Sequence, residues 1–148
     1  MSSPLRQPNR SVLLAAIVSV LFACLLTWPV VLSPSTVLVG HPGNDTWNHV
    51  WGYWWVGEAL KNGMWPIQAD KLAYPVGGTL YFIDTMQALF SWPIQLLFGA
   101  EVAFNVVMIA QIALSGFAAW LLARKVTGDS IASFCALFLF QMAPHLLG

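Results

Sequence analysis

The stretch Ser11–Ser33 reads SVLLAAIVSVLFACLLTWPVVLS and contains no charged residue. A helix of these 23 residues would be about 34 Å long, enough to cross the hydrocarbon core of a bilayer, which is about 30 Å thick. Arg6 and Arg10 precede it with no acidic residue, so the positive-inside rule predicts a cytoplasmic stub over residues 1–10. A cleaved signal peptide is the alternative. The apolar region of a signal peptide is shorter, however, and no A-x-A-like cleavage site follows this stretch.

The whole chain has the composition of a membrane protein. Of its 148 residues, 58% are apolar and only 8% are charged, against about 25% charged in typical soluble domains. Six Lys and Arg balance six Asp and Glu, so the chain lacks the basic surface that binds nucleic acid. Two cysteines, Cys24 and Cys135, lie inside apolar runs and exclude a disulfide scaffold. We therefore predict an all-α protein of the cell membrane, with the lipid bilayer as its first partner.

Two more apolar runs, residues 102–123 and 131–147, predict further transmembrane helices. The basic pair that opens residues 124–130 predicts that this loop is cytoplasmic. The second run has 17 residues, the lower limit for a span. We expect about three transmembrane helices, with a large first extracytoplasmic loop over residues 34–99.

Residues 79–98, TLYFIDTMQALFSWPIQLLF, are open to two interpretations. They are long enough to span, yet four polar residues recur along one helix face: Asp84, Gln87, Ser91 and Gln95. Apolar residues lie mostly on the other side: Phe82, Met86, Phe90 and Leu97. This pattern favours a helix over residues 80–98 that lies flat in the membrane interface, and a flat helix also keeps both basic clusters cytoplasmic. Pro93 should kink the helix in either case.

A second interfacial helix is expected over residues 46–61. Asn44 or Asp45 can cap its start, and Asn62-Gly63 can stop it. Four tryptophans recur on this helix at helical spacing: Trp47, Trp51, Trp54 and Trp55. They indicate either an aromatic belt at the headgroup level or a wall that stacks a sugar ring or flanks a lipid chain.

Asp45 and His49 are four residues apart and would share a helix face, with Gly52 leaving room above them. Such a pair could hold a metal or perform acid–base chemistry, whereas the simpler interpretation is that Asp45 is a helix N-cap. An unpaired carboxylate at the membrane surface is costly, so Asp84 should face water or meet a cation or a ligand headgroup. Asn105 and Gln111 are expected to form hydrogen bonds between helices.

The motifs G-N-D-T-W-N-H-V-W (residues 43–51), A-Y-P-V-G-G-T-L (residues 73–80) and R-K-V-T-G (residues 124–128), in this order, resemble a known family. The chain is similar, from about Gly40 to His145, to the membrane glycosyltransferases of the GT-C superfamily, in particular to a bacterial group of large integral membrane proteins. No second acidic residue adjoins Asp45, so the paired-acid motif of that group is absent.

The resemblance implies an enzyme that transfers a sugar from a polyprenyl-phosphate donor to an acceptor on the outer face of the membrane. It implies Asp45 as catalytic base or metal ligand, with a divalent metal as a candidate cofactor. The substrate-binding residues expected from the motifs and from the reasoning above are Asn48, His49, Trp51, Tyr74 and Asp84.

The superfamily core has at least seven spans, so the chain is expected to be the N-terminal piece of a longer protein and to be inactive alone. The alternative function is a non-catalytic multi-pass membrane protein, such as a transporter or an assembly subunit.

Overall fold

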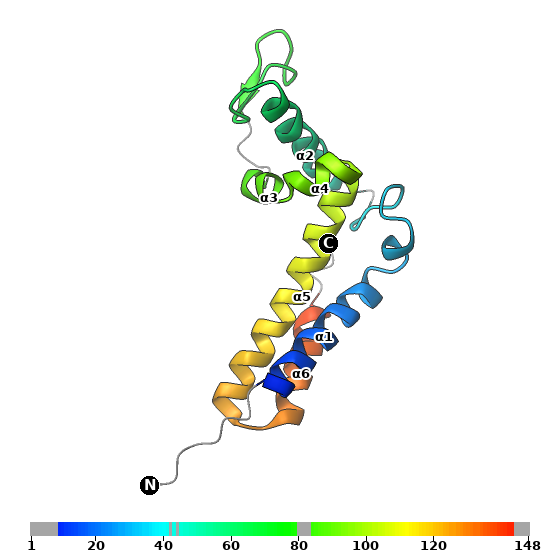
Figure 1. Cartoon of the computed structure of the whole chain (residues 1–148), viewed down its shortest axis with the longest axis vertical. Helices are drawn as coiled ribbons and strands as arrows, with labels where there is room; N and C mark the ends of the chain where they lie inside the picture. The colour runs from blue at the N-terminus through cyan, green and yellow to red at the C-terminus, as the bar shows by residue number, and fades with distance from the viewer. Residues whose placement is uncertain (1–8, 42, 44, 80–83, 144–148) are drawn as a thin grey trace. The chain divides into compact units, whose positions relative to one another are not determined.

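The computed structural model describes residues 9–41, 43, 45–79 and 84–143 (Figure 1). Most of these residues are helical, as the sequence predicts. They form two units that are described separately. The three-helix unit comprises residues 1–28 and 109–147, and the loop unit comprises residues 29–108. Among the described residues, one helix, α5 (Ala100–Thr127), is long and apolar enough to cross a membrane.

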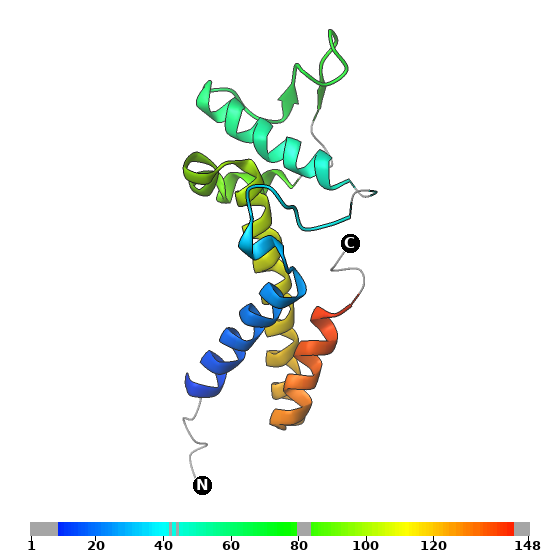
Figure 2. The same cartoon turned by 90° about the vertical axis from the view of Figure 1, so that its right-hand side faces the viewer.

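The three-helix unit contains α1 (Asn9–Leu26), the C-terminal part of α5 and α6 (Ser130–Gln141) (Figure 2). Two clusters of small and large apolar side chains hold these helices together. One cluster centres on Ala15, Trp120 and Leu137, and the other on Ala23, Ile112 and Ala113. The small side chains of Ala15 and Ala23 let α1 approach the other two helices closely, and larger side chains on those helices fill the space between them.

A buried polar side chain links the three helices. Gln141 is fully buried, and its Nε2 donates to the Ser19 carbonyl at 3.1 Å and to the Ile112 carbonyl at 2.9 Å. The Ser19 hydroxyl in turn donates to the Ala113 carbonyl. Gly116 faces the Gln141 side chain, and a Cβ at Gly116 would lie 2.4 Å from Gln141 Cγ. Since hydrogen bonds are strong where water is excluded, this network fixes the register of α1, α5 and α6.

The first predicted span is shorter as a continuous helix than the sequence suggests. Helix α1 ends at Leu26 instead of Ser33, and residues Val30–Leu32 form the 3-10 helix η1. Pro29 explains the end, because it has no backbone N–H to donate and it disfavours helical geometry at the preceding residue. Helix α6 likewise ends at Gln141, because Pro144 follows so closely in the sequence. The rest of the predicted third span, residues 144–147, lies outside the described residues.

The loop unit is built around α2 (Thr46–Lys61), whose bounds coincide with those that the capping and stop signals predict. Its core joins α2 to α3 (Thr85–Phe90), to α4 (Trp92–Phe98) and to the start of α5. The buried members of this core are Val50, Tyr53, Val56, Ala88, Ala103 and Phe104. Two short strands, β1 (Gln68–Ala69) and β2 (Gly78–Thr79), pair antiparallel and pack near the other end of α2.

The predicted helix over residues 80–98 is two short helices. Helix α3 ends at Phe90 and α4 begins at Trp92, with Ser91 between them. Pro93 lies in the first turn of α4, where its missing N–H breaks no helical hydrogen bond, so the chain restarts a helix there. Residues 80–83 lie outside the described residues. Helices of six and seven residues are far shorter than the roughly 20 residues needed to cross a bilayer.

Asn105 has a different partner from the one that the sequence predicts. Its Oδ1 accepts from the Val39 backbone N–H at 2.9 Å, and its Nδ2 donates to the carbonyls of Pro34 and Val37. Asn105 therefore holds the irregular segment after η1 and does not pair with another helix. Gln111, the other polar residue that was expected to bond between helices, is exposed on α5.

Replacing Gly116 by alanine should loosen the three-helix unit. The new Cβ would overlap the middle of the buried Gln141 side chain, so Gln141 must move and lose its bonds to α1 and α5. We expect a loss of about 1–3 kcal/mol of unfolding free energy, measured by thermal denaturation in detergent. Leu114→Ala, at an exposed position of the same helix, is the control and should change stability much less. Equal losses in the two variants would contradict the Gln141 link.

Candidate functional site

One face of α2 packs against the polar stripe, the line of polar residues that the sequence predicts along one helix face: Asp84, Gln87, Ser91 and Gln95. His49, Tyr53 and Gly57 are four residues apart in sequence and follow one face of α2. Opposite them lie Asp84, Gln87 and Gln95, which the sequence placed on one helix face. We call these six residues the polar seam. The stripe therefore faces α2, with its polar groups turned into the protein.

At one end of the seam, His49 and Asp84 lie together. His49 Nδ1 is 3.3 Å from Asp84 Oδ2, an ion pair when the imidazole is protonated. Nδ1 is buried and forms no hydrogen bond with the described residues, so the contact is one of distance and charge alone. Roughly a third of each side chain is exposed, 33% for His49 and 40% for Asp84. The contact joins two predicted site residues that are far apart in the sequence, and Asp84 also keeps part of its side chain exposed to solvent.

The middle of the seam is formed by Tyr53, which is fully buried. Its hydroxyl donates to Gln87 Oε1 at 3.4 Å, a long hydrogen bond. Burial raises the pKa of Tyr53 well above the ordinary value of 10, and the negative charge of Asp84 raises it further. Tyr53 is therefore a neutral phenol at physiological pH.

The far end of the seam is a close contact between helices. Gln95 Nε2 donates to the Ala88 carbonyl at 2.9 Å, which ties α4 to α3 across the break at Ser91. Its Oε1 approaches α2 at Gly57, where a Cβ would lie only 2.9 Å away. Gly57 is thus a glycine because α4 approaches the backbone of α2 at this point.

Asp45 is not the partner of His49 that the spacing predicts. Its Oδ1 accepts from Asn48 Nδ2 at 3.1 Å, so Asp45 and Asn48, two predicted site residues, contact each other on the exposed surface. Asp45 precedes α2 but makes no side-chain capping bond, because its φ of −73° and ψ of 15° are helix-like, whereas an N-cap is typically extended. Asp129, with ψ of 135°, does cap α6 through Ala132 N–H. Asn44, the other candidate cap, lies outside the described residues.

The four tryptophans of α2 do not share one environment. Trp55 is buried under β1, and its Nε1 donates to the Pro66 carbonyl at 3.1 Å. Trp51 is half-buried and stacks on Trp55 with an interplanar angle of 4°. Trp47 and Trp54 are exposed, and Lys71 Nζ lies 5.4 Å from the Trp54 ring. Because Trp55 belongs to the core, a single wall or belt of four indoles is excluded. Trp47 and Trp54 expose their rings, and Trp51 is partly exposed.

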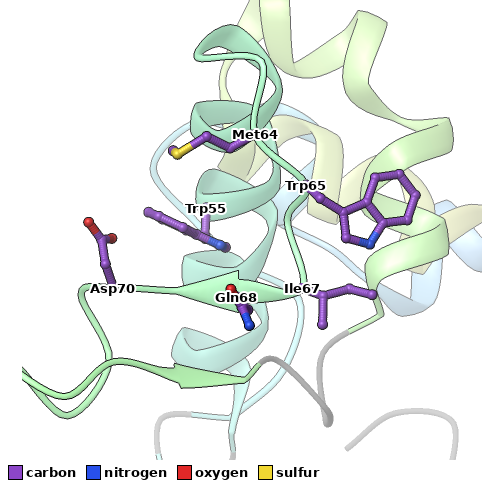
Figure 3. A pocket seen from close by; sticks show the side chains of 6 residues that line it. All are labelled: Trp55, Met64, Trp65, Ile67, Gln68 and Asp70. Carbon is purple, nitrogen blue, oxygen red and sulfur yellow. The ribbon is translucent and has the colours of Figure 1, made fainter.

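Gly52 does not leave open room beside His49, because it is buried. A hollow exists instead near the C-terminal end of α2, with a volume of about 500 Å³. Figure 3 shows the side chains that line it: Trp55, Met64, Trp65, Ile67, Gln68 and Asp70. Tyr74, a predicted substrate-binding residue, is 86% exposed and is not among these residues.

Metal-ligating side chains are sparse in the part of the chain that the structure describes. Groups of three or more His, Cys, Asp or Glu that could hold a metal ion are absent there. Asp45, the metal-ligand candidate, would need oxygen atoms from a substrate phosphate to complete the coordination shell of a cation such as Mg²⁺.

The outer face of α3 and α4 is apolar and exposed. Met86 is 62% exposed, Phe90 79% and Leu97 75%. Polar groups on the inside and apolar groups on the outside reverse the pattern of a helix on a water-soluble protein. Such a face suits the acyl–headgroup boundary of a membrane.

Sequence reasoning identified His49 and Asp84 separately but missed Tyr53 and Gln87 as parts of their surroundings. The four-residue spacing of His49, Tyr53 and Gly57 is the signal that could have placed Tyr53 on the same helix face as His49. Comparisons of the chain with protein-family models, with curated proteins and with solved structures returned no match. The functional argument therefore depends on the residues and their geometry.

Alkaline pH should destabilise the loop unit through Tyr53. The folded state raises the pKa of Tyr53, so the resulting stability is complete below the unfolded tyrosine pKa of about 10 and is lost as pH rises above it. We expect Tyr53→Phe to flatten the fall in melting temperature above about pH 10, measured in detergent. Tyr74→Phe, at an exposed tyrosine, is the control and should leave the fall unchanged. Identical profiles for wild type and Tyr53→Phe would refute the assignment.

Proposed function

We propose that this chain supplies the N-terminal membrane part and first extracytoplasmic loop of a GT-C-type glycosyltransferase. The enzyme transfers a sugar from a polyprenyl-phosphate donor to an acceptor on the outer face of the membrane. The main support is that two predicted site residues, His49 and Asp84, lie together one helical turn from Asp45 at the start of α2, although the Asp45 carboxylate contacts Asn48 and not His49. Asp84 contacts the His49 side chain, and the His49 backbone N–H donates to the Asp45 carbonyl at 3.1 Å.

The membrane arrangement in this proposal has three spans, α1, α5 and α6, with a cytoplasmic N-terminus. Helix α5 has the length and composition of a span, and α1 and α6 are shorter apolar helices. Helices α3 and α4 lie flat in the outer interface. Their exposed apolar face supports this placement, as does the single residue, Gly99, between the end of α4 and the start of α5.

Within the loop unit, Asp45 is the general base toward the acceptor hydroxyl or the ligand of a metal that positions the donor phosphate. Its exposed position lets substrate reach it, and Asn48 orients its carboxylate. Trp47 and Trp54 offer exposed indole faces on the same helix, suited to packing against a sugar ring or a lipid chain.

A non-catalytic membrane component is the second candidate function. The observation that favours it is the tip of the β1–β2 hairpin, where Tyr74 is 86% and Val76 is 88% exposed. Two apolar side chains at a protruding turn are suited to contact with a partner protein. In this case the loop unit would bind a transporter or assembly partner and would transfer no sugar.

The proposed topology places α2 outside and the α5–α6 loop inside. Single cysteines at the exposed positions Asn62 and Val126, with Cys24 and Cys135 replaced by alanine, test this topology. An impermeant thiol reagent applied to intact cells should label the cysteine at Asn62 and spare that at Val126 until the cells are opened. Labelling at Val126 in intact cells would overturn the topology.

Asp45→Asn in the full-length protein should lower sugar transfer by about 10²-fold or more while the protein folds normally. The amide keeps an oxygen that can accept from Asn48 but removes the negative charge. The assay measures transfer of a radiolabelled sugar from polyprenyl phosphate in membranes that contain the protein. Glu101→Gln, at an exposed acidic residue of the same unit, is the matched control. Wild-type transfer by Asp45→Asn would rule out the catalytic assignment.

A further inference from the structure

Two histidines of the loop unit have opposite surroundings at the same ring atom. His41 Nδ1 accepts a hydrogen bond from the Gly43 backbone N–H at 3.0 Å, so this nitrogen carries a lone pair in the neutral ring. His49 Nδ1 instead lies 3.3 Å from Asp84 Oδ2 and is buried without a hydrogen-bond partner among the described residues. A nitrogen that faces a carboxylate favours carrying the proton, because two lone pairs would repel each other.

We propose that Asp84 is a positioning residue that holds His49 with Nδ1 protonated, so that His49 Nε2 is the proton acceptor for the sugar acceptor in the transfer reaction. The two nitrogens of an imidazole point in different directions, so a contact of Nδ1 with Asp84 leaves Nε2 directed elsewhere. A third of the His49 side chain is exposed, although Nδ1 is buried. This inference rests on the proposed glycosyltransferase function and assigns a catalytic role within the same site.

The transfer step balances with these groups alone. The acceptor oxygen forms a bond to the anomeric carbon of the donor sugar as the bond from that carbon to the phosphate oxygen breaks. The hydroxyl proton of the acceptor moves to His49 Nε2, and polyprenyl phosphate leaves with the electron pair of the broken bond. His49 becomes an imidazolium, whose positive charge the Asp84 carboxylate stabilises across the 3.3 Å contact.

This assignment separates the roles of the two aspartates. Asp84 faces the imidazole from α3, whereas Asp45 lies on the exposed surface with its carboxylate bound to Asn48. Asp45 then keeps the second of its two proposed roles, that of ligand to a cation on the donor phosphate. The spacing of Asp45 and His49 in the sequence favours the opposite pairing, so the two pairings can be tested against each other.

The positioning role is tested by nitrogen NMR of the full-length protein in nanodiscs, with ¹⁵N-labelled histidine. Spectra are recorded well above the ordinary histidine pKa of about 6.5, where neutral rings reveal their tautomers. Signals are assigned by comparison with His41→Gln and His49→Gln. We expect the Nδ1–H tautomer at His49 and the Nε2–H tautomer at His41, which is the internal reference. An Nε2–H tautomer at His49 in the wild type would overturn the proposal.

Two matched substitutions identify the carboxylate that is responsible. Asp84→Ala should shift His49 toward the Nε2–H tautomer and leave His41 unchanged. The fold should tolerate it, because the Asp84 side chain makes no capping bond to α3 and the hydrogen bonds of the seam, Tyr53 to Gln87 and Gln95 to Ala88, do not involve Asp84. Asp45→Ala should leave the tautomers of both histidines unchanged. A shift in Asp45→Ala, or none in Asp84→Ala, would refute the Asp84–His49 pair.

The catalytic role is tested in the transfer assay. His49→Gln should lower the rate by about 10²-fold or more, and Asp84→Ala should lower kcat with little change in KM. A wild-type rate in His49→Gln would remove His49 from the reaction. If the wild type transfers no sugar, the proposed function fails and the catalytic role of His49 fails with it, whereas the tautomers still decide whether Asp84 positions His49.

Discussion

The arrangement of the loop unit depends on the polar seam between α2 and the α3–α4 pair. Helices α3 and α4 are too short to be stable alone, so they need tertiary contacts to form. Their polar side chains find partners on α2, and their apolar side chains are left outside. In water the exposed Phe90 and Leu97 would favour aggregation, whereas in the proposed interfacial position they would insert into the lipid surface. The seam therefore determines both the position of Asp84 and which apolar side chains of α3 and α4 are left exposed.

The same constraint governs the three-helix unit. In the proposed membrane arrangement, apolar surfaces would give little specificity between these helices, because lipid tails are as apolar as leucine. Register must then come from hydrogen bonds and close fit, which Gln141, Ser19 and Gly116 supply together. A polar side chain that looks out of place in the apolar sequence of α6 is the one that sets where α6 packs. In each unit, a few polar groups fix the register of helices that apolar packing alone would leave unspecified.

Local features of the fold could be predicted from the sequence, and long-range contacts could not. Asn62-Gly63 ends α2 and Pro93 breaks the following helix, because these residues act on their own backbone. Hydropathy alone predicts a first helix that continues to Ser33, because it treats Pro29 like any other residue, whereas α1 ends at Leu26. The burial of Trp55 under β1 depends on a hairpin that joins segments with weak strand signals. Similarly, the spacing of the polar residues of α3 and α4 predicts that they share a helix face, but it does not predict that α2 packs against this face.

The candidate site shows the same limit more sharply. Sequence spacing pairs His49 with Asp45, because residues four apart share a helix face. The structure pairs His49 with Asp84, because the α2–α3 contact buries Nδ1 on the side where Asp84 arrives, while Asp45 turns to Asn48. Two carboxylates that the sequence alone treats as alike thus have different neighbours: one faces an imidazole and the other a neutral amide. Different neighbours allow different roles, since a carboxylate beside an imidazole orients and stabilises it, whereas an exposed carboxylate can meet a cation. In the proposed site the two acids have separate roles because helix packing brings only one of them, Asp84, to the histidine.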